Sequence, residues 1–406
     1  MATRPAVAPA RRAAYEVVLR VFEDDAYADR AFAAAADRLD ARDRALAQQI
    51  AYGTVQRVRA LDHGIEALGR RPVRKLDPPV RAALRLGAFQ LAYLDRVAVH
   101  AAVNESVELV RAARLERAVP FTNAVMRRLA GGLRDLLDGL PEGPLKHSYP
   151  DWIFELWRRD WGTEEALALM RAQNQAPETV VRRVRGEIEG EATDVPGAWR
   201  VARVDERALA EGRIWPQSRG SQLAGLAVGS QPGERALDLC AAPGGKATML
   251  AGDVVAVELH EGRARELAEN VRRLGADNVQ VVNADGLALP PELDGFDRAL
   301  VDAPCSGLGV LAGRPDLRWR AQPLPELQLA LVRAAAERVK PGGTVTFSVC
   351  TLNADENEAI VEATGLEVDD LGAEWPMFRH PKRPEFLLTT PHRHGTSGFF
   401  VARLRV

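Results

Sequence analysis

Apolar residues recur at spacings of three and four throughout the first third of the chain. This periodicity predicts amphipathic helices. The helices are separated by breaks near Asp24, Pro72, Pro78 and Pro120, where the periodic pattern stops. The predicted helices cover residues 13–22, 45–68, 80–94, 101–110 and 121–137. We therefore expect residues 1–140 to form an all-α helical bundle.

The pattern changes after a segment rich in Gly and Pro at residues 139–149, which is typical of a linker. Helical signals at residues 152–159 and 163–172 then open a mixed segment that ends near Gly229. We expect residues 141–229 to form a small α+β subdomain that links the helical bundle to the rest of the chain.

From residue 230 onward, short apolar runs alternate with helical patterns. This alternation predicts an α/β fold with a mostly parallel sheet covered on both faces, over residues 230–406. Strands are expected near Ala236, Val254, Val279, Phe296 and Thr344, with a late strand at residues 398–403. Ligands of such sheets bind beyond the carboxyl ends of the strands.

Residues 235–250, RALDLCAAPGGKATML, carry the clearest local signal. The apolar start predicts a buried strand, the small residues up to Gly245 predict a turn, and Lys246 opens a helical pattern. Because Gly244 and Gly245 lack a Cβ atom, the backbone of this turn is able to approach a ligand that carries phosphate or carboxylate. A glycine turn alone is a weak motif, since it can also simply join two core elements.

Acidic residues end the next two predicted strands. Glu258 closes one run 20 residues after Asp238, where an acidic group meets ribose hydroxyls in doubly wound sheets, and Asp285 closes the following run. This spacing indicates a nucleoside cofactor. The turn lacks the G-x-G-x-x-G fingerprint of dinucleotide enzymes, which disfavours a nicotinamide and favours S-adenosylmethionine, a cofactor without pyrophosphate.

Composition narrows the class of protein. The chain is 47% hydrophobic, yet no apolar run approaches the ~20 residues of a membrane span, and no signal-peptide pattern opens it. We expect a cytoplasmic protein that does not cross a membrane. The three cysteines, Cys240, Cys305 and Cys350, lack C-x-x-C spacing, so neither a disulfide framework nor a metal site is predicted.

The net charge of −2 hides an asymmetry. Residues 1–140 hold 23 Lys and Arg against 17 Asp and Glu, a net of +6, whereas the remaining residues hold 31 against 39, a net of −8. A basic front part favours contact with a polyanion, although surplus arginine on solvated helices would give the same balance. One group of cations in this part is able to hold phosphates without reading sequence: Arg57, Arg59, Arg70, Arg71, Arg74 and Lys75.

Two of the thiols follow predicted strand ends. Asp302 ends the fourth strand shortly before Cys305, and Cys350 follows the fifth strand, so all three are expected at the rim that holds the cofactor turn. A single cysteine there is usually a buried hydrophobe, but a pair beside an aspartate indicates covalent catalysis. A thiolate that adds to carbon 6 of cytosine makes carbon 5 nucleophilic, and Asp302 is able to meet the nitrogen edge of the base. The residues alone do not decide which thiol adds.

Six motifs occur in order over the last part of the chain, and they resemble the Nol/Nop/Sun family of RNA cytosine-5 methyltransferases. The motifs are CAAPGGK at Cys240, HEGRARELAENVRRLG at His260, DAPCSG at Asp302, GRPDLRWR at Gly313, SVCTLNADENEAIV at Ser348 and GFFVARL at Gly398. This resemblance implies a Rossmann-like, S-adenosylmethionine-dependent methyltransferase domain at residues 230–406.

The front of the chain is similar to the helical domain first described in the transcription antitermination factor NusB. The resemblance covers most of residues 10–140, and residues 104–109 and 121–129 are its most specific parts. It implies RNA binding by residues 1–140. Together the two resemblances point to the RsmB-type branch of the family, which methylates small-subunit ribosomal RNA.

The resemblance also implies residue roles. Cys350 is the implied nucleophile, Cys305 assists product release, Glu258 holds the ribose and Asp285 the adenine amino group. The implied cofactor pocket comprises Cys240, Ala241, Ala242, Pro243, Gly244, Gly245, Lys246, Glu258, Arg263, Asp285 and Asp302. Arg314, Arg318 and Arg320 follow the Cys305 loop and are expected to hold the RNA strand, although an exposed arginine loop would look the same.

Three other functions fit parts of the sequence. A non-catalytic RNA-binding or assembly factor is disfavoured because a retired site has no need for both thiols and Asp302. A DNA methyltransferase is disfavoured because no target-recognition insertion separates the motifs. An adenine amino-methyltransferase is disfavoured because Cys305 stands where an aromatic residue would stack on the base.

Overall fold

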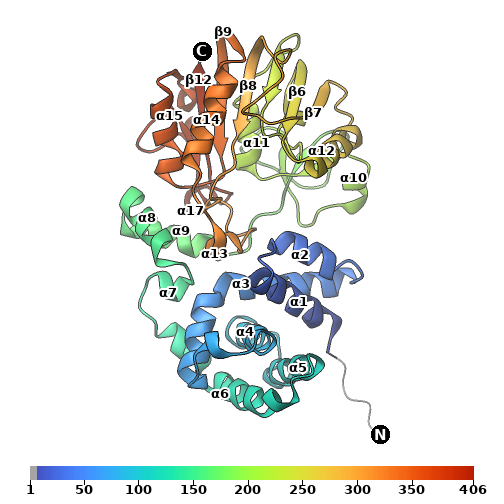
Figure 1. Cartoon of the computed structure of the whole chain (residues 1–406), viewed down its shortest axis with the longest axis vertical. Coiled ribbons are helices and arrows are strands. Elements are labelled where there is room, and N and C mark those ends of the chain that lie inside the picture. The colour runs from blue at the N-terminus through green and yellow to red at the C-terminus, as the bar shows by residue number, and fades with distance from the viewer. Residues whose placement is uncertain (1–6) are drawn as a thin grey trace. The chain divides into compact units, whose positions relative to one another are not determined.

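The chain folds into two compact units, described by a computed structural model that covers residues 7–406 (Figure 1). Among the described residues, the helical unit comprises residues 7–174 and the later segment Leu311–Arg320. The sheet unit comprises Gln175–Val310 and Ala321–Val406. The chain therefore leaves the sheet unit after the Cys305 loop, contributes ten residues to the helical unit, and returns.

The helical unit confirms the five helices that the apolar periodicity predicts, and it adds short helices around them. Proline begins several of these helices, as its fixed φ and missing N–H allow. The helices are α1 (Pro9–Glu23), α2 (Ala28–Ala35), α3 (Ala41–Gly69), α4 (Pro78–Tyr93), α5 (Val99–Ala112), α6 (Val119–Asp138), α7 (Pro144–His147), α8 (Asp151–Trp161), α9 (Thr163–Ala172) and α13 (Leu317–Arg320).

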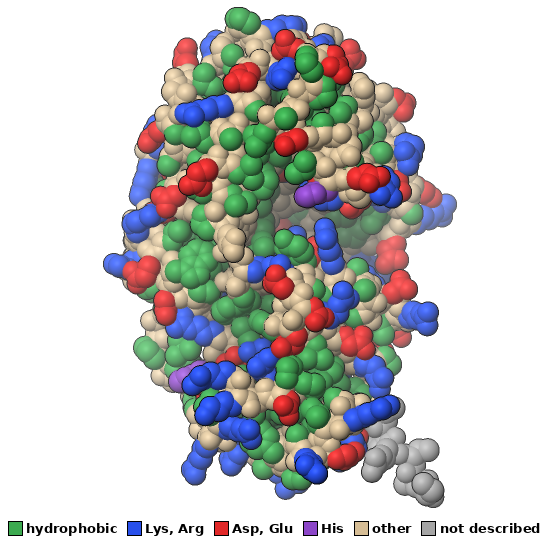
Figure 2. All heavy atoms as spheres, viewed as in Figure 1, with side chains coloured by type: hydrophobic (Ala, Val, Ile, Leu, Met, Phe, Trp, Pro, Cys, Tyr) green, Lys and Arg blue, Asp and Glu red, His purple; other side chains and the backbone are tan. Residues whose placement is uncertain are grey.

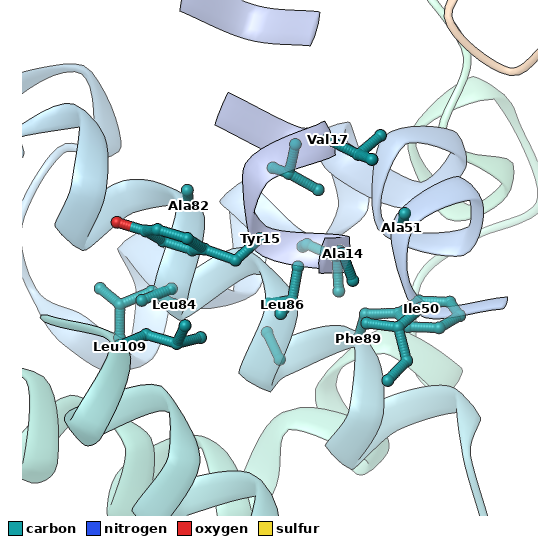
Figure 3. Close-up of a cluster of buried hydrophobic side chains, with 14 of the residues drawn as sticks. Ala14, Tyr15, Val17, Ile50, Ala51, Ala82, Leu84, Leu86, Phe89 and Leu109 are labelled. Carbon is teal, nitrogen blue, oxygen red and sulfur yellow. The ribbon is translucent and has the colours of Figure 1, made fainter. Parts of the chain in front are cut away.

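One apolar cluster fills the helical unit, and most of its members come from the inward faces of α1, α2, α3, α4, α5 and α6. Figure 3 shows Tyr15, Ile50, Leu84 and Phe89 converging on this core. Each fully buried side chain of this kind contributes roughly 1.5–3 kcal/mol to folding, so the helical faces, and not the connecting turns, hold the unit together. In the view of Figure 2, Lys and Arg side chains lie on the surface of the helical unit, with Asp and Glu among them.

The sheet unit holds the α/β fold that the alternation predicts. Its larger sheet has the strand order β10-β12-β9-β8-β5-β6-β7, with β11 paired to β12. Strands β7, β6, β5, β8 and β9 are parallel, and β12 runs antiparallel to β9. The strands are β5 (Arg235–Asp238), β6 (Asp253–Glu258), β7 (Val279–Asn283), β8 (Phe296–Asp302), β9 (Val339–Val349), β10 (Glu367–Asp369), β11 (Leu387–Thr389) and β12 (Phe399–Arg405).

Helices cover this sheet, with α12 packed against β6 and β7, and α14 against β8 and β9. Because the parallel strands end at one edge, the residues that follow β5, β6, β8 and β9 gather there. The helices of this unit are α10 (Glu206–Ala210), α11 (Arg219–Leu226), α12 (Glu261–Leu274), α14 (Pro325–Ala336), α15 (Glu358–Thr364), α16 (Leu371–Glu374) and α17 (Pro391–His394).

The segment expected to be one linking subdomain, residues 141–229, is divided between the two units. Helices α8 and α9 belong to the helical unit, where the Tyr149 ring lies 5.6 Å from that of Trp157. The sheet unit takes a small antiparallel sheet of order β2-β3-β1-β4. Its strands are β1 (Val180–Arg183), β2 (Glu191–Ala192), β3 (Ala198–Arg200) and β4 (Ile214–Pro216).

Neither a membrane segment nor a metal cluster is found in the described part of the chain. None of its helices is both long enough and apolar enough to cross a lipid bilayer. Over residues 7–406, no group of three or more His, Cys, Asp or Glu side chains is arranged to hold a metal ion.

Candidate active site

The two thiols that follow β8 and β9 lie side by side. Asp302, the last residue of β8, is in register with Ser348 of β9, so the loops after these strands start at the same edge of the sheet. The Sγ atoms of Cys305 and Cys350 are 3.5 Å apart, and neither cysteine is in a disulfide. The structure thus brings together the two cysteines that the sequence predicts at one rim.

Their contact makes the two thiols unequal. The hydrogen bond from the Cys305 thiol lowers the pKa of Cys350, and Lys246 favours the same thiolate, while burial and Asp302 oppose it. The same bond, together with burial, raises the pKa of Cys305. A thiolate is the nucleophilic form of cysteine, so this asymmetry favours ionisation of Cys350 over Cys305.

Asp302 is held from both sides. Ser348 Oγ donates to one carboxylate oxygen at 2.7 Å, and Lys246 Nζ donates to the other at 2.6 Å. The Lys246 ammonium also lies 5.1 Å from the centre of the Phe399 ring. These contacts fix the orientation of the Asp302 carboxylate, which remains partly exposed beside the thiols.

The turn after β5 is shaped by its neighbours. Gly244 has a φ of +106°, which favours glycine, and a Cβ atom there would lie 2.8 Å from Leu267 Cδ1. Asn270 Nδ2 donates to the Pro243 carbonyl at 2.9 Å, and Thr248 Oγ1 donates to the Gly244 carbonyl at 2.7 Å. Side chains from α12 and from the residues after Lys246 therefore hold the predicted cofactor turn in place.

The acidic residues of the next strands lie at the same edge. Glu258 ends β6 almost fully buried, and it accepts from the His260 N–H at 3.0 Å. Arg263 bridges Glu258, at 3.4 Å, and the Ala242 carbonyl of the turn, at 3.2 Å. Asp285 lies beyond β7 in an exposed turn, where its side chain accepts from the Leu287 N–H.

Asp238 and Cys240 flank the start of the turn, and both are buried. Asp238 is 1% exposed, and neither of its carboxylate oxygens has a hydrogen-bond partner among the described residues. Burial, followed by the charge of Asp302, raises the pKa of Asp238 to about 7. Burial also raises the pKa of Cys240, so this third cysteine stays a thiol. Asp238 entered the sequence analysis only as the residue 20 positions before Glu258, and no role was predicted for it.

A buried carboxylate that sequence reasoning missed ties the two thiol loops together. Glu356 is fully buried and follows Cys350, yet it accepts hydrogen bonds from the loop that carries Cys305. Its hydroxyl partner, Ser306 Oγ, also lies 2.7 Å from Thr351 Oγ1. The other donors are Ser306 N at 3.0 Å, Leu324 N at 3.1 Å, Gln328 Nε2 at 2.9 Å and Asn353 Nδ2 at 3.1 Å.

The arginines expected to hold RNA lie in the helical unit, and one of them is not at the surface. Arg318 is fully buried, and its guanidinium donates to the carbonyl oxygens of Gln56 at 3.1 Å and Gln173 at 3.0 Å. It also lies 3.9 Å from the centre of the Tyr149 ring. The assignment of Arg318 to RNA is therefore wrong, because its side chain is buried and its Nη atoms donate to backbone carbonyls.

The other two arginines are partly exposed and paired with acids. Arg314 lies 3.4 Å from Asp29, and Arg320 lies 3.1 Å from Asp25. Their contact with RNA stays a prediction. In the basic cluster of α3, Arg59 is likewise engaged, since it donates to Asp151 at 2.8 Å.

Comparison with known proteins identifies both parts of the chain. A family model described as 16S rRNA methyltransferase RsmB/F matches residues 226–405, and the NusB family model matches residues 8–131. A probable ribosomal RNA small subunit methyltransferase B from Synechocystis is 34% identical over 98% of this chain and 99% of its own. Ribosomal RNA small subunit methyltransferase B from Thermus thermophilus is 35% identical over 90% of this chain and 89% of its own.

Solved structures share the fold. The crystal structure of PH0851 covers all of both chains with a TM-score of 0.80 at 24% identity. NSun6 from Pyrococcus horikoshii, solved with SFG, covers 64% of this chain and 98% of its own with a TM-score of 0.54 at 22% identity. With relatives above 30% identity over nearly its whole length, this chain belongs to the RsmB/F family of methyltransferases that act on small-subunit ribosomal RNA, with a NusB-type helical domain in front.

Proposed function

We propose that this protein transfers a methyl group from S-adenosylmethionine to carbon 5 of a cytidine in small-subunit ribosomal RNA, through a covalent adduct of Cys350. The observation that carries the proposal is the 3.5 Å contact between the Cys350 and Cys305 sulfurs beside Asp302. Carbon 5 of cytosine is a poor nucleophile. Its methylation therefore needs a thiolate that adds to carbon 6 and an acidic group next to that thiolate.

The residues around the turn fit the cofactor. Neighbouring side chains keep the turn free of side chains at Gly244 and Gly245, because a Cβ atom there would meet Leu267 or Trp215. Asp238 offers two buried carboxylate oxygens without partners. Glu258 would hold the ribose hydroxyls, Asp285 the adenine amino group, and residues 240–246 the methionyl part. When bound, S-adenosylmethionine supplies an electrophilic methyl group on a sulfonium. The related NSun6 structure contains SFG, an analogue of this cofactor, which supports the assignment.

The chain's own groups account for the remaining steps. The Cys350 thiolate forms a bond to carbon 6 of the base, and Asp302 meets ring nitrogen 3 and the amino edge as charge moves into the ring. Carbon 5 then takes the methyl group. Loss of the carbon-5 proton breaks the bond between sulfur and carbon 6 and returns the electron pair to Cys350.

Cys305 acts in the last step, as the base that accepts the carbon-5 proton. This role requires an ionised thiol. While Cys350 is bonded to carbon it carries no negative charge, so the contact that raises the pKa of Cys305 is relieved during the step that needs its thiolate. In double-stranded RNA the target base must first leave the helix.

Trapping the adduct tests the proposal. With Cys305→Ala we expect a covalent protein–RNA complex that survives denaturing electrophoresis, because elimination fails. With Cys350→Ala we expect no adduct and no methylation of small-subunit rRNA by bisulfite mapping, while S-adenosylmethionine still binds. The wild-type protein, which keeps both thiols of the pair, is the control and should trap nothing.

Two results would contradict the proposal in different ways. An adduct formed by Cys350→Ala would exchange the roles of the two thiols. Full methylation by both single variants would exclude covalent catalysis by this pair.

A further inference from the structure

A buried guanidinium lies beside the cofactor turn without a balancing charge. Arg182, on β1 of the small sheet, is 7% exposed, and its Nη2 donates to Thr248 Oγ1 at 2.7 Å. Its Nε atom has no hydrogen-bond partner, and no carboxylate of the described residues forms an ion pair with it. Burial alone lowers the pKa of Arg182 to about 10, well above neutrality, so the group stays charged.

The contact through Thr248 connects this arginine to the turn. Thr248 Oγ1 accepts from Arg182 and donates to the Gly244 carbonyl at 2.7 Å. Arg182 is in register with Trp215 of the neighbouring strand β4, so the two side chains share a face of the small sheet. A Cβ atom on Gly245 would lie 2.8 Å from Trp215 Nε1, which shows that this face meets the turn.

A second buried polar atom without a partner lies on the same side. Gln217, two residues after Trp215, is 7% exposed, and its Oε1 atom has no hydrogen bond. A would-be Cβ on Gly245 is 3.6 Å from its Cδ atom. Unused donors and acceptors around a turn that itself lacks side chains are typical of a site that a polar ligand completes.

Two other buried arginines of the described residues have more partners than Arg182. Arg219, 4% exposed, pairs with Glu178 at 2.9 Å and Asp194 at 2.8 Å. Arg318 also lacks an ion pair and a partner for its Nε atom, but its Nη atoms donate to backbone carbonyls and its guanidinium lies over the Tyr149 ring, whereas Arg182 has a single hydroxyl partner. Because a buried charge is ordinarily paired, the missing partner of Arg182 points to an anion that binds there.

We propose that Arg182 binds the carboxylate of the methionine part of S-adenosylmethionine. This inference rests on the proposed function. The methionine part carries an ammonium and a carboxylate. On the strand-end side of the turn, Asp302 is paired with Lys246 and Glu258 with Arg263, so Asp238 is the acidic group there without a partner. The acidic side attracts the ammonium and repels the carboxylate. The carboxylate then faces the opposite side of the turn, where the Arg182 guanidinium lies.

The test compares two ligands that differ by the carboxylate. Isothermal titration of the full chain measures the Kd of S-adenosylmethionine and of decarboxylated S-adenosylmethionine, which keeps the sulfonium and the ammonium. We expect the wild-type protein to bind the first more tightly. Arg182→Met should weaken S-adenosylmethionine binding by roughly 30-fold or more and change binding of the decarboxylated ligand by less than about 3-fold.

Two further variants separate the charge from the fold. Arg183→Met removes the neighbouring, exposed arginine, which lies over the Trp199 ring, and should leave both Kd values unchanged. Arg182→Lys keeps a cation and should retain part of the preference for the carboxylate. It serves if Arg182→Met does not fold.

Two outcomes would overturn the inference, and a third would contradict the proposed function on which it rests. Equal weakening of both ligands by Arg182→Met would mean that the arginine only supports the turn through Thr248. Equal affinity of the wild-type protein for the two ligands would mean that no cation reads the carboxylate. Failure of the wild-type protein to bind either ligand would instead contradict the proposed function.

Discussion

At the scale of single residues, the two thiols behave as one titrating pair. Whichever sulfur ionises first accepts the S–H of the other, so the first proton leaves more easily and the second with more difficulty. The position of Lys246 near Cys350 adds to this difference. The contact between the two sulfurs therefore favours ionisation of one thiol, which a contact between two non-ionising apolar groups would not do.

The pH dependence of alkylation checks this pairing. Cys350 should react with iodoacetamide with a midpoint at lower pH than an ordinary thiol, since the thiolate is the reactive form and increases as pH rises through the pKa. Cys305→Ala removes the donor and should move the midpoint to higher pH. Mass spectrometry of the Cys350 peptide gives the rate at each pH.

The internal reference is Cys240, whose raised pKa predicts slow labelling throughout. A Cys305→Ala midpoint that stays in place or falls would show that the hydrogen bond does not prepare Cys350.

Asp238 gives a second prediction at this scale. Its pKa is about 7 in the folded protein and ~3.9 when unfolded, so the folded state binds more protons between these values. The contribution of Asp238 to the stability of the wild-type protein therefore falls as pH rises from about 4 to about 7. Asp238→Asn cannot ionise, so the variant should match the wild type near pH 4 and exceed it above pH 7 by up to about 4 kcal/mol.

Urea unfolding of the ligand-free protein at several pH values measures this difference. A stability difference that stays constant with pH would contradict the raised pKa of Asp238.

At the scale of elements, Glu356 sets the spacing of the two loops that follow β8 and β9. It receives donors from the Cys305 loop, from the start of α14 and from its own turn, so removing it leaves several buried donors without an acceptor. A single buried donor left unpaired costs roughly 1–3 kcal/mol.

We predict that Glu356→Ala lowers the free energy of unfolding by about 3 kcal/mol or more, and methylation by at least about 100-fold, because the sulfurs lose their spacing. Affinity for S-adenosylmethionine should change little, since the turn at residues 240–246 makes none of these bonds. Denaturant unfolding, a methylation assay and titration calorimetry measure the three quantities.

Glu362→Ala is the matched control, because Glu362 forms an exposed pair with Arg383. A loss of cofactor affinity as large as the loss of methylation would show that Glu356 supports the whole sheet edge, not the thiol loops.

The elements that could be predicted from the sequence are those with a local pattern. Apolar runs marked β5, β6, β8 and β9, and the shared direction of parallel strands placed Asp302, Cys305 and Cys350 together. Glu356 could not be found in this way, because Ser306, its partner, lies 50 residues away and no periodicity connects them. Arg182 was missed for the same reason, since its environment comes from β4 and the turn.

Arginines were the least predictable residues. The loop after Cys305 carries Arg314, Arg318 and Arg320, a composition typical of an exposed, RNA-holding loop. The structure instead places Arg318 over Tyr149, with its donors on carbonyls of distant residues. The sequence around Arg318 gives no sign that its guanidinium will donate to the carbonyls of Gln56 and Gln173.

At the scale of the whole molecule, the helical unit is completed by a segment from far along the chain. Trp319 Nε1 donates to the Val55 carbonyl at 2.8 Å, and Trp319 packs against the core of this unit. Together with Arg318 it joins α3 to residues 148–173. The NusB family model, which matches residues 8–131, does not include this segment.

We predict that Arg318→Met destabilises the protein by about 2–3 kcal/mol, because buried carbonyls lose their donors, without changing the salt dependence of RNA binding. Arg314→Met should do the opposite, with little effect on stability and a salt slope reduced by about 1 if this residue contacts a phosphate. Denaturant unfolding and RNA titrations at several salt concentrations measure both. If Arg318→Met reduced the salt dependence of RNA affinity, Arg318 would contact RNA after all.

The excursion of Leu311–Arg320 into the helical unit also fixes an order of events during synthesis. A ribosome releases the first nine helices long before it reaches this segment, and all of Gln175–Val310 is made in between. The packing of the helical unit is therefore incomplete during synthesis until Leu311–Arg320 has been made and has docked onto it. Any shortened product that stops before residue 311 lacks part of the front of the protein as well as the back.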